Sequence, residues 1–491
     1  MVLLLIVSVL VGTFLAEIVL RTFGGAWFNG QLRELSVSVH ALRQADGDDA
    51  QQALMLRTGG LSLRFSLAAF VVLAGLFAIA SSAPWVFHWS ESQQTTYIVA
   101  ASLAATVWWP LRNLGRSNKA VVPAVGHAYS ALERCLHWII LKPAVVRQIS
   151  FALERQFALP KWSNSITLAP HPSQTKNPAD GAVYVCGLAR SGTTVLLQIL
   201  DQVDVFRSLH YTDMPFVLAP NLWKQITKFA PRQASTVERA HGDGIQIGFD
   251  SPEGFEEVFW RTVETSPPKT KCLNAETPST EMLRYFADYR AIVANPRMAG
   301  KPSNRTPRRY LSKNNNNLLR LHSLCIDPTA TVLLVYRDPV ATARSLHRQH
   351  HRFCAVQSSD RFIRTYMNLL SHYEFGLDHR PFSFAAPVMD GTLLPDHPNY
   401  WLDYWNAVYC YVLESQYLRI HLVNHDALRA APVKALNTIF DAVSIQGDAA
   451  SLSLQINTIS ASAGTEEFSP ALLQRAEATH RALLASSKNL L

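Results

Sequence analysis

The chain has 491 residues, 48% of them hydrophobic, and a formal net charge of +8. This composition supports a large buried core and excludes a chain that is disordered over most of its length. The positive charge suits an anionic ligand, a membrane surface or a nucleic acid. Because no dense Lys/Arg tract is present, we expect no nucleic-acid partner. The six cysteines are scattered without a CxxC pair, so we expect neither a structural metal nor a disulfide framework.

Residues 1–115 contain three apolar segments and are predicted to form a membrane region. Residues 2–20 lack a basic n-region and a small-residue cleavage site, which favours a retained helix over a signal peptide. Residues 65–85 are long enough to cross a bilayer. Residues 95–111 form a third span, or an interfacial or core helix, because they are shorter and end in Trp108-Trp109-Pro110. We therefore expect an integral membrane protein with two to three transmembrane helices.

Basic residues set the orientation of these segments. The loop between the first two segments contains five arginines, residues 86–94 contain no Lys or Arg, and Arg112, Arg116 and Lys119 follow the third segment. The positive-inside rule then places the first loop and everything after residue 112 in the cytoplasm.

Residues 116–181 are predicted to be a helical connector and linker. The segment Trp138-Ile139-Ile140-Leu141 is a candidate membrane-proximal contact, and residues 169–180 are rich in Pro, Asn, Ser and Thr. A soluble domain is expected at residues 182–491.

The most informative stretch is Gly187–Thr194, which reads GLARSGTT. An apolar run precedes it and another follows, which predicts a strand, a tight loop and the start of a helix. Such a loop presents backbone N–H groups and the positive end of a helix dipole to an anion. The spacing is close to that of a Walker A loop, but Thr193 replaces the expected lysine and the cation is Arg190 instead. The loop is therefore predicted to bind a phosphate other than the β- and γ-phosphates of ATP.

A second apolar run, residues 330–336, leads into Arg337-Asp338-Pro339 and a helix. Two strand–turn–helix units imply an α/β fold with a parallel sheet flanked by helices. Ligands of such folds lie beyond the carboxyl ends of the strands, so both polar turns are expected to face one crevice. Arg337 has a planar fork suited to phosphate, and Ser345 lies two turns into the helix, within reach of the same anion. Alone, an Arg-Asp-Pro turn is often a loop with a local ion pair, but the two motifs together are more specific.

With both motifs, the chain resembles the sulfotransferases that use 3′-phosphoadenosine 5′-phosphosulfate (PAPS). GLARSGTT resembles their 5′-phosphosulfate loop, in the arginine form RSGTT of tyrosylprotein sulfotransferases and many bacterial members, and YRDPVATARSL resembles their 3′-phosphate motif. Four further segments resemble a bacterial sulfotransferase-type family: residues 209–216, 312–317, 348–350 and 422–428. The last of these lacks the usual tyrosine and glutamate. The resemblance runs from about residue 183 to about residue 443 and does not include the membrane region.

The resemblance implies a P-loop-like, sulfotransferase-like fold, with PAPS as co-substrate and no metal. The residues that would hold the 5′-phosphate and the sulfuryl group are Arg190, Ser191, Gly192, Thr193 and Thr194. Those that would hold the 3′-phosphate are Arg337 and Ser345.

Sulfuryl transfer needs an in-line acceptor, neutralisation of charge on the bridging oxygen, and a base for the acceptor proton. Arg190 is expected to neutralise the leaving-group charge. Lys313 either reaches the transferring group, which the resemblance favours, or is a surface lysine. Asp213 is the expected base. The open alternatives for the base are His210, His241 and Glu256.

The acidic stretch around Glu256 also has a structural interpretation. Asp250 or Ser251 would cap a helix with Pro252 at its first position.

These features predict a membrane-anchored sulfotransferase that moves a sulfuryl group from PAPS to a hydroxyl or amine acceptor. The lipid bilayer is an expected partner, and the acceptor is a small molecule, a lipid or a glycan. The catalytic domain is expected on the cytoplasmic side, in a bacterial inner membrane. Two alternatives stay open: a P-loop-type kinase or NTPase, and a non-catalytic membrane protein with a degenerate nucleotide fold.

Overall fold

A computed structural model describes ten stretches of the chain. They are residues 131–158, 181–227, 237–238, 246–247, 251–264, 271–294, 308–384, 389–415, 420–456 and 467–486. All lie in one compact unit, Ala120–Leu491. The three expected membrane segments and the Pro-rich linker at 169–180 lie outside the described residues. Within the described stretches, no helix is both long enough and apolar enough to span a membrane.

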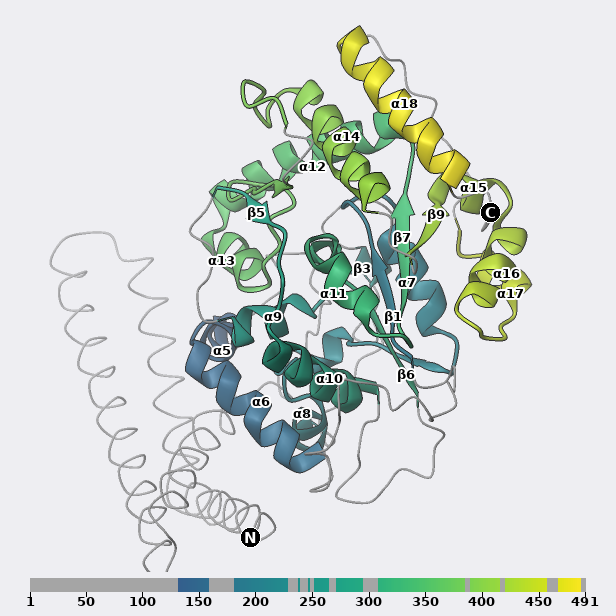
Figure 1. The fold of residues 1–491 in the computed structure, drawn as a ribbon. Helices are drawn as coiled ribbons and strands as arrows, with labels where there is room; N and C mark the ends of the chain where they lie inside the picture. Colours follow the sequence, from purple (N-terminus) through teal and green to yellow (C-terminus); the bar gives the residue numbers. More distant parts are fainter. Residues whose placement is uncertain are drawn as a thin grey trace, which may run out of the picture. The chain divides into compact units, whose positions relative to one another are not determined.

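The central feature is a five-stranded sheet in the order β2-β6-β1-β7-β9, in which every neighbouring pair is parallel (Figure 1). Its strands are β1 (Val183–Cys186), β2 (Phe206–Arg207), β6 (Arg309–Lys313), β7 (Thr331–Tyr336) and β9 (Ile420–Asn424). Two short sheets accompany it, β3 (Val237–Glu238) with β4 (Gln246–Ile247) and β5 (Leu273–Asn274) with β8 (Phe382–Ser383). The prediction of a parallel sheet flanked by helices is confirmed.

Strand β1 lies in the middle of the sheet, where the strand order reverses. Val183 pairs with Leu311 of β6 on one side and with Thr331 of β7 on the other. Open α/β sheets bind ligands outside the carboxyl ends of the strands at such a switch point. The topology thus puts the ends of β1, β6 and β7 side by side.

Both faces of the sheet are buried, as expected for parallel strands covered by helices. Along β1, Tyr184 and Cys186 belong to one hydrophobic core, while Val183 and Val185 belong to another. The second core is closed by α7 (Thr193–Asp201), α15 (His425–Ala430), α16 (Pro432–Ala442) and α17 (Ala449–Ser453).

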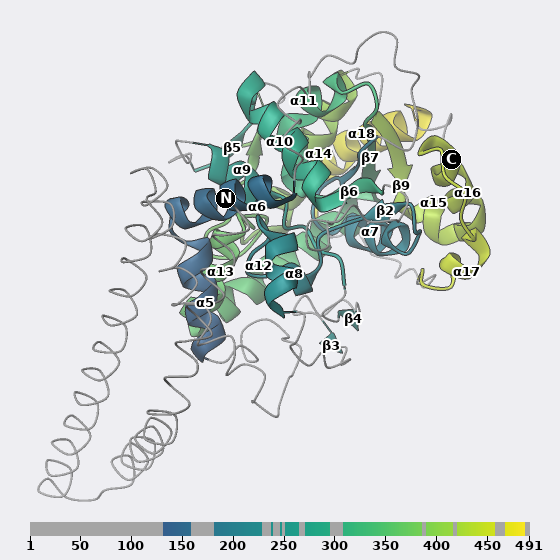
Figure 2. The same cartoon turned by 90° about the horizontal axis from the view of Figure 1, so that it is seen from below.

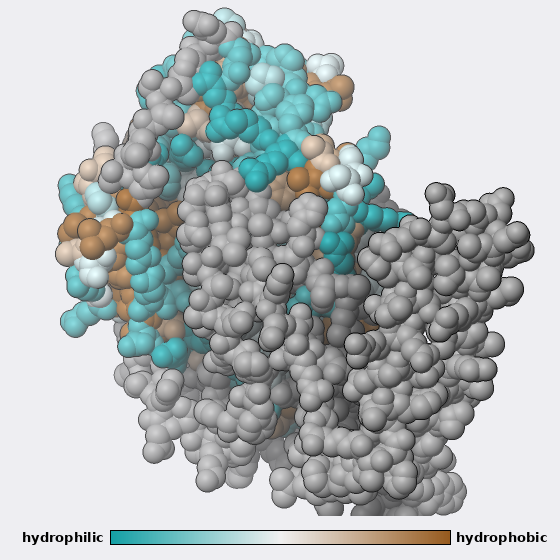
Figure 3. Space-filling view, turned by 180° about the vertical axis from the view of Figure 1, so that it is seen from behind, coloured by the Kyte–Doolittle hydropathy of each residue, from teal (hydrophilic) through white to brown (hydrophobic). Residues whose placement is uncertain are grey.

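The first core is larger and is closed by many helices (Figures 1 and 2). They are α6 (Ala144–Ala158), α9 (Glu257–Val263), α10 (Thr280–Ala294), α11 (Leu321–Ile326), α12 (Pro339–Ser359), α13 (Arg361–Leu369), α14 (Pro398–Glu414) and α18 (Pro470–Ser486). Seen from behind, apolar residues also reach the surface beside hydrophilic ones (Figure 3). The remaining short elements are η4 (Tyr211–Asp213), α8 (Pro220–Thr227) and η5 (Asn315–Arg320).

Helices α5 (Ala131–Leu141) and α6 lie within the predicted connector. The Phe151 ring of α6 is 5.5 Å from that of Phe259 and 6.1 Å from that of Tyr289. Arg147 Nε donates to Thr262 Oγ1 at 2.9 Å. Helix α6 is therefore part of the larger core, whereas the domain boundary at residue 182 stays a prediction.

Candidate functional site

The loop after β1 has a backbone that few residues tolerate. Gly187 has φ 149°, Arg190 has φ 72° and Gly192 has φ 99°. A Cβ atom on Gly187 would lie 2.3 Å from the Val335 carbonyl oxygen, and one on Gly192 would lie 2.0 Å from Cδ2 of His425. Glycine is needed at both positions because the loop is pressed against β7 and α15.

Hydrogen bonds fix this loop from within. The Ser191 hydroxyl donates to the Leu188 carbonyl oxygen at 2.6 Å, and the Ser191 N–H donates to the same oxygen at 3.2 Å. The Tyr409 hydroxyl donates to the Val335 carbonyl at 3.0 Å and accepts from the Leu188 N–H at 3.4 Å. Ser191 thus shapes the loop, while α7 begins at Thr193, where backbone N–H groups have no acceptor within the helix.

The turn after β7 is the second half of the predicted site. Asp338 caps α12 by accepting from the Ala341 N–H at 2.8 Å, and its own N–H donates to Asp426 Oδ2 at 2.8 Å. Arg337 Nε lies 3.8 Å from Asp426 Oδ1, beyond hydrogen-bond distance. Among the described residues, Arg337 Nε is a buried atom without a hydrogen-bond partner. Burial lowers the pKa of Arg337, and the Asp426 carboxylate opposes that shift.

The two halves meet. Arg190 Nε donates to Ser345 Oγ at 3.0 Å, and the side chain of Ser345 is buried on α12. Cys186 at the end of β1 pairs with Leu334 of β7, so the two loops leave the sheet next to each other. This contact brings the two turns together, although they are about 150 residues apart in the sequence. The crevice that they are expected to share stays a prediction.

Lys313 ends β6, the other neighbour of β1. It is only 7% exposed, so the surface-lysine alternative is wrong. Its Nζ lies 3.7 Å from Glu253 Oε1. Lys313 is thus a buried cation at the same edge of the sheet as the phosphate loop.

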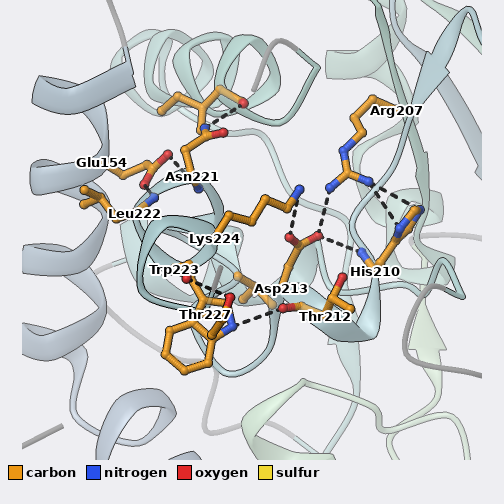
Figure 4. A network of polar contacts seen from close by, with 12 residues as sticks. Glu154, Arg207, His210, Thr212, Asp213, Asn221, Leu222, Trp223, Lys224 and Thr227 are labelled. Carbon is orange, nitrogen blue, oxygen red and sulfur yellow. Dashed lines mark hydrogen bonds and ion pairs between the residues drawn. The ribbon is translucent and has the colours of Figure 1, made fainter. Parts of the chain in front are cut away.

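Asp213, the expected base, is enclosed by polar groups (Figure 4). It has no exposed surface, and Oδ2 accepts from the His210 N–H at 2.9 Å. Arg207 Nη2 lies 3.4 Å from Oδ2, and Lys224 Nζ lies 3.4 Å from Oδ1. His210 itself contacts Asp201, with Nε2 2.9 Å from Oδ2. These contacts describe a carboxylate held between two cations, and the base role of Asp213 stays a prediction.

Glu256, another candidate for the base, is also a buried carboxylate that accepts hydrogen bonds. Glu256 is 1% exposed and accepts from the Tyr310 hydroxyl at 2.9 Å and from Trp260 Nε1 at 3.1 Å. His241 lies outside the described residues.

The predicted helix start at Pro252 is wrong, because α9 begins at Glu257. Pro252 instead forms an antiparallel bridge with His210, and the flanking backbone hydrogen-bonds to residues 209 and 211. A long-range pairing therefore replaces the local helix cap.

The structure adds residues that the motifs did not single out. Asn315, at the start of η5, accepts from Thr193 Oγ1 at 3.4 Å and donates to Glu374 Oε1 at 3.2 Å. Glu374 and His372 lie in the segment after α13, far from either motif in the sequence. No sequence signal marks them, because only folding brings them to the end of β6.

His425, at the start of α15, faces Gly192. Burial, with the nearby Arg337 and Arg429 adding to its effect, lowers the pKa of His425 to about 3. This imidazole is therefore neutral beside the phosphate loop. Within the described stretches, no group of three or more His, Cys, Asp or Glu residues could hold a metal ion.

The match to a family model agrees with the motifs. Residues 182–380 match the model of a sulfotransferase family. Among solved structures, sulfotransferase STF9 from Mycobacterium avium is similar with 14% identity and a TM-score of 0.35, covering 75% of this chain and 81% of that protein. Sulfotransferase STF1 from Mycobacterium tuberculosis H37Rv is similar with 13% identity and a TM-score of 0.32, covering 77% of this chain and 90% of that protein. No curated protein matches the chain.

The matched region runs from the strand before the phosphate loop to the segment that contains Glu374, and it includes both predicted phosphate motifs. Residues 182–380 are thus similar to a sulfotransferase family.

Proposed function

We propose that the chain transfers a sulfuryl group from PAPS to a hydroxyl or amine acceptor. The observation that carries the proposal is the contact between Arg190 and Ser345, which joins two anion-binding turns at the ends of neighbouring strands. PAPS has two separated phosphate sites, whereas a nucleoside triphosphate presents one contiguous phosphate chain. Two adjacent cradles therefore suit PAPS better.

The residues present fit such a donor. The first turn of α7 offers backbone N–H groups at Thr193 and Thr194 to the 5′-phosphosulfate. The buried and unbonded Arg337 Nε would gain an acceptor from a 3′-phosphate oxygen. Ser345 is held by Arg190 and would contribute its hydroxyl to the same phosphate.

Electrostatics and positioning would supply most of the catalysis. When the acceptor oxygen bonds to sulfur, the bond from sulfur to the bridging oxygen breaks and negative charge develops on the leaving phosphate. Arg190 would stabilise that charge, and Lys313, at the end of the adjacent strand, would supply a second cation. The acceptor proton must pass to a base.

A kinase or NTPase is less well supported. Thr193 stands where a Walker lysine would lie, and its hydroxyl donates to Asn315. The acid at the end of β7, Asp338, is occupied as the cap of α12. Binding measurements decide between the two classes.

Calorimetry should compare adenosine 3′,5′-bisphosphate with ATP. We expect the bisphosphate to bind more tightly. Tighter binding of ATP would overturn the proposal in favour of a kinase, and binding of neither nucleotide would favour a non-catalytic protein. Turnover of PAPS against membrane extracts, followed by mass spectrometry for an added sulfuryl group, then identifies the acceptor.

We also propose that the enzyme is anchored in a membrane, with the domain on the cytoplasmic side of a bacterial inner membrane and a lipid or glycan as acceptor. The apolar segments at 2–20, 65–85 and 95–111 support this proposal. So does Trp138, which is 48% exposed and has Lys142 Nζ 4.7 Å from its ring centroid. Tryptophan beside a basic residue is typical of a membrane interface.

The anchoring proposal has its own test. The full chain should stay with membranes after an alkaline carbonate wash and should need detergent for release. Protease added to sealed inverted vesicles should cleave the domain, whereas protease added to intact spheroplasts should not. Release by carbonate would contradict the anchor, and cleavage in spheroplasts would contradict the orientation.

A further inference from the structure

An imidazole and a carboxylate lie together in the segment that follows α13. His372 Nδ1 is 3.4 Å from Glu374 Oε1, and their side chains are 24% and 13% exposed. Ser371, with φ 57°, and Gly376, with φ 94°, turn the backbone on either side of the pair. The Ser371 carbonyl accepts from Asn316 Nδ2 at 3.3 Å, which fastens this segment to η5.

The side chain of Asn315 connects the pair of His372 and Glu374 to the phosphate loop. Asn315 Nδ2 donates to Glu374 Oε1, and Asn315 Oδ1 accepts from Thr193 Oγ1. Thr193 is the first residue of α7, at the end of the phosphate loop. His372 is therefore separated from the loop by only two intervening side chains.

A small cavity adjoins the pair. Its volume is about 10 Å³, and Lys313, Asn315, His372 and Glu374 are among its lining residues. A space of this size holds about one water molecule. The hydroxyl of an acceptor, or a water molecule in its stead, would there meet the imidazole, Lys313 and Asn315, and Asn315 is hydrogen-bonded to Thr193 at the end of the phosphate loop.

Charges around the pair set its protonation. Burial alone would raise the pKa of Glu374, but His372 and Lys313 lower it to about 2. Burial alone would lower the pKa of His372, but the Glu374 carboxylate raises it above 6.5, with Lys313 opposing and Glu253 adding to that rise. Histidine is the side chain whose ordinary pKa lies closest to neutral pH, so an imidazole at this place can exchange a proton with an acceptor there.

We propose that His372 is the general base that takes the proton of the acceptor, and that Glu374 is the positioning residue that orients the imidazole. This inference rests on the proposed sulfuryl transfer. The acceptor proton passes to His372 Nε2 as the acceptor oxygen bonds to sulfur. The bond between sulfur and the bridging oxygen breaks, and its electron pair stays on the 5′-phosphate of the leaving nucleotide.

The geometry favours His372 over Asp213. Asp213 has no exposed surface, and its two carboxylate oxygens already contact Arg207 and Lys224. His372 reaches both the cavity and the surface. A carboxylate behind an imidazole is the common arrangement for orienting a histidine base.

The first test follows the release of inorganic sulfate from PAPS, with water as the acceptor. His372→Gln should lower kcat by about 100-fold or more, while its affinity for adenosine 3′,5′-bisphosphate stays within about twofold of that of the wild type. His322→Gln, at an exposed position on α11, is the matched control and should leave both quantities unchanged. A His372→Gln variant with near wild-type kcat, or a comparable loss only in Asp213→Asn, would overturn the inference.

The second test examines the role of Glu374 through the pH dependence of kcat/KM. His372 must be neutral to accept a proton, so kcat/KM should rise with pH through a midpoint above 6.5 in the wild type. Glu374→Gln removes the charge that raises this pKa and should move the midpoint to lower pH. An unmoved midpoint would show that Glu374 does not act through His372.

Different results would contradict the proposed sulfuryl transfer and the assignment of His372 as its base. If the wild type does not bind adenosine 3′,5′-bisphosphate, sulfuryl transfer itself is wrong. If the wild type binds it and turns PAPS over while His372→Gln does so equally well, only the assignment of the base is wrong. Bisphosphate affinity also shows that each variant is folded.

Discussion

At the scale of single residues, Gly192 shows how closely the phosphate loop is fitted to its surroundings. Its φ of 99° lies in the left-handed region, and a Cβ atom there would overlap the His425 ring. Backbone conformation and packing thus impose the same residue independently.

Gly192→Ala should therefore lower the free energy of unfolding by at least about 1 kcal/mol from the left-handed conformation alone, and it should weaken binding of adenosine 3′,5′-bisphosphate. Chemical unfolding and calorimetry measure the two effects. The double variant Gly192→Ala/His425→Ala should recover the part of the lost unfolding free energy that comes from overlap with the His425 ring. Gly391→Ala is the control, because no atom lies within 4 Å of a Cβ atom at that position. Equal stability of Gly192→Ala and Gly391→Ala would contradict the argument.

Arg190 connects the two halves of the proposed donor site through its hydrogen bond to Ser345. Arg190→Ala should weaken binding of adenosine 3′,5′-bisphosphate by roughly 10- to 100-fold, because a hydrogen bond to a charged group contributes about 1.5–3 kcal/mol. Arg190→Lys keeps the charge without the planar fork and should lose less. Arg361→Ala, at an exposed position on α13, should bind normally. Wild-type affinity in Arg190→Ala would remove Arg190 from the site.

At the scale of elements, Glu154 shows how α6 holds α8 (Figure 4). Its Oε1 accepts from the Asn221 N–H at 3.1 Å and its Oε2 accepts from the Leu222 N–H at 3.0 Å, at the start of α8. Helix α8 in turn carries Lys224, which contacts Asp213. A fully buried carboxylate thus connects the predicted connector to the edge of the candidate site.

Burial raises the pKa of Glu154 from 4.5 to about 7, although the two N–H donors oppose the shift. The folded state therefore binds this proton more tightly than the unfolded state, so the contribution of Glu154 to stability is present below pH 4.5 and is lost as pH rises towards 7. Glu154→Gln keeps a neutral side chain at every pH. Its stability relative to the wild type should rise by up to roughly 3 kcal/mol between pH 4.5 and 7. Denaturant unfolding at several pH values measures this difference, and a pH-independent difference would contradict it.

The elements that carry the two phosphate motifs were predictable because their signals are local. An apolar run followed by a glycine-containing or Arg-Asp-Pro turn predicts a strand and a helix start, and β1–α7 and β7–α12 have this form. The α9 start was mispredicted because Pro252 pairs with His210 about 40 residues earlier. A local cap motif contains no information about such a partner.

At the scale of the whole molecule, the described unit extends beyond the predicted sulfotransferase domain. Phe151 of α6 packs against Phe259 and Tyr289, and Arg155 contacts Asp288 of α10. Helix α6 therefore closes the larger core even though it precedes the family match at residue 182.

A chain shortened to residues 182–491 should accordingly be much less stable than one that begins at residue 120. Loss of a buried phenylalanine side chain alone costs about 3–5 kcal/mol, and the first N–H groups of α8 would lose their acceptors. Thermal unfolding followed by circular dichroism, with bisphosphate binding as a second measurement, compares the two chains. Equal unfolding temperatures would show that α6 is only a connector.

The sequence by itself predicted the α/β fold class, which the structure confirms, and it predicted two phosphate motifs and PAPS as donor, which stay predictions. Each of these depends on short stretches in which strand, turn and helix signals follow one another. Only the tertiary structure decided that Arg190 meets Ser345, that Lys313 is buried, and that Asp213 lies between two cations. It also brought His372 and Glu374 to the loop through Asn315. The physical reason is that parallel strands pair across long separations in the chain, so the residues gathered at their carboxyl ends share a site without sharing a sequence pattern.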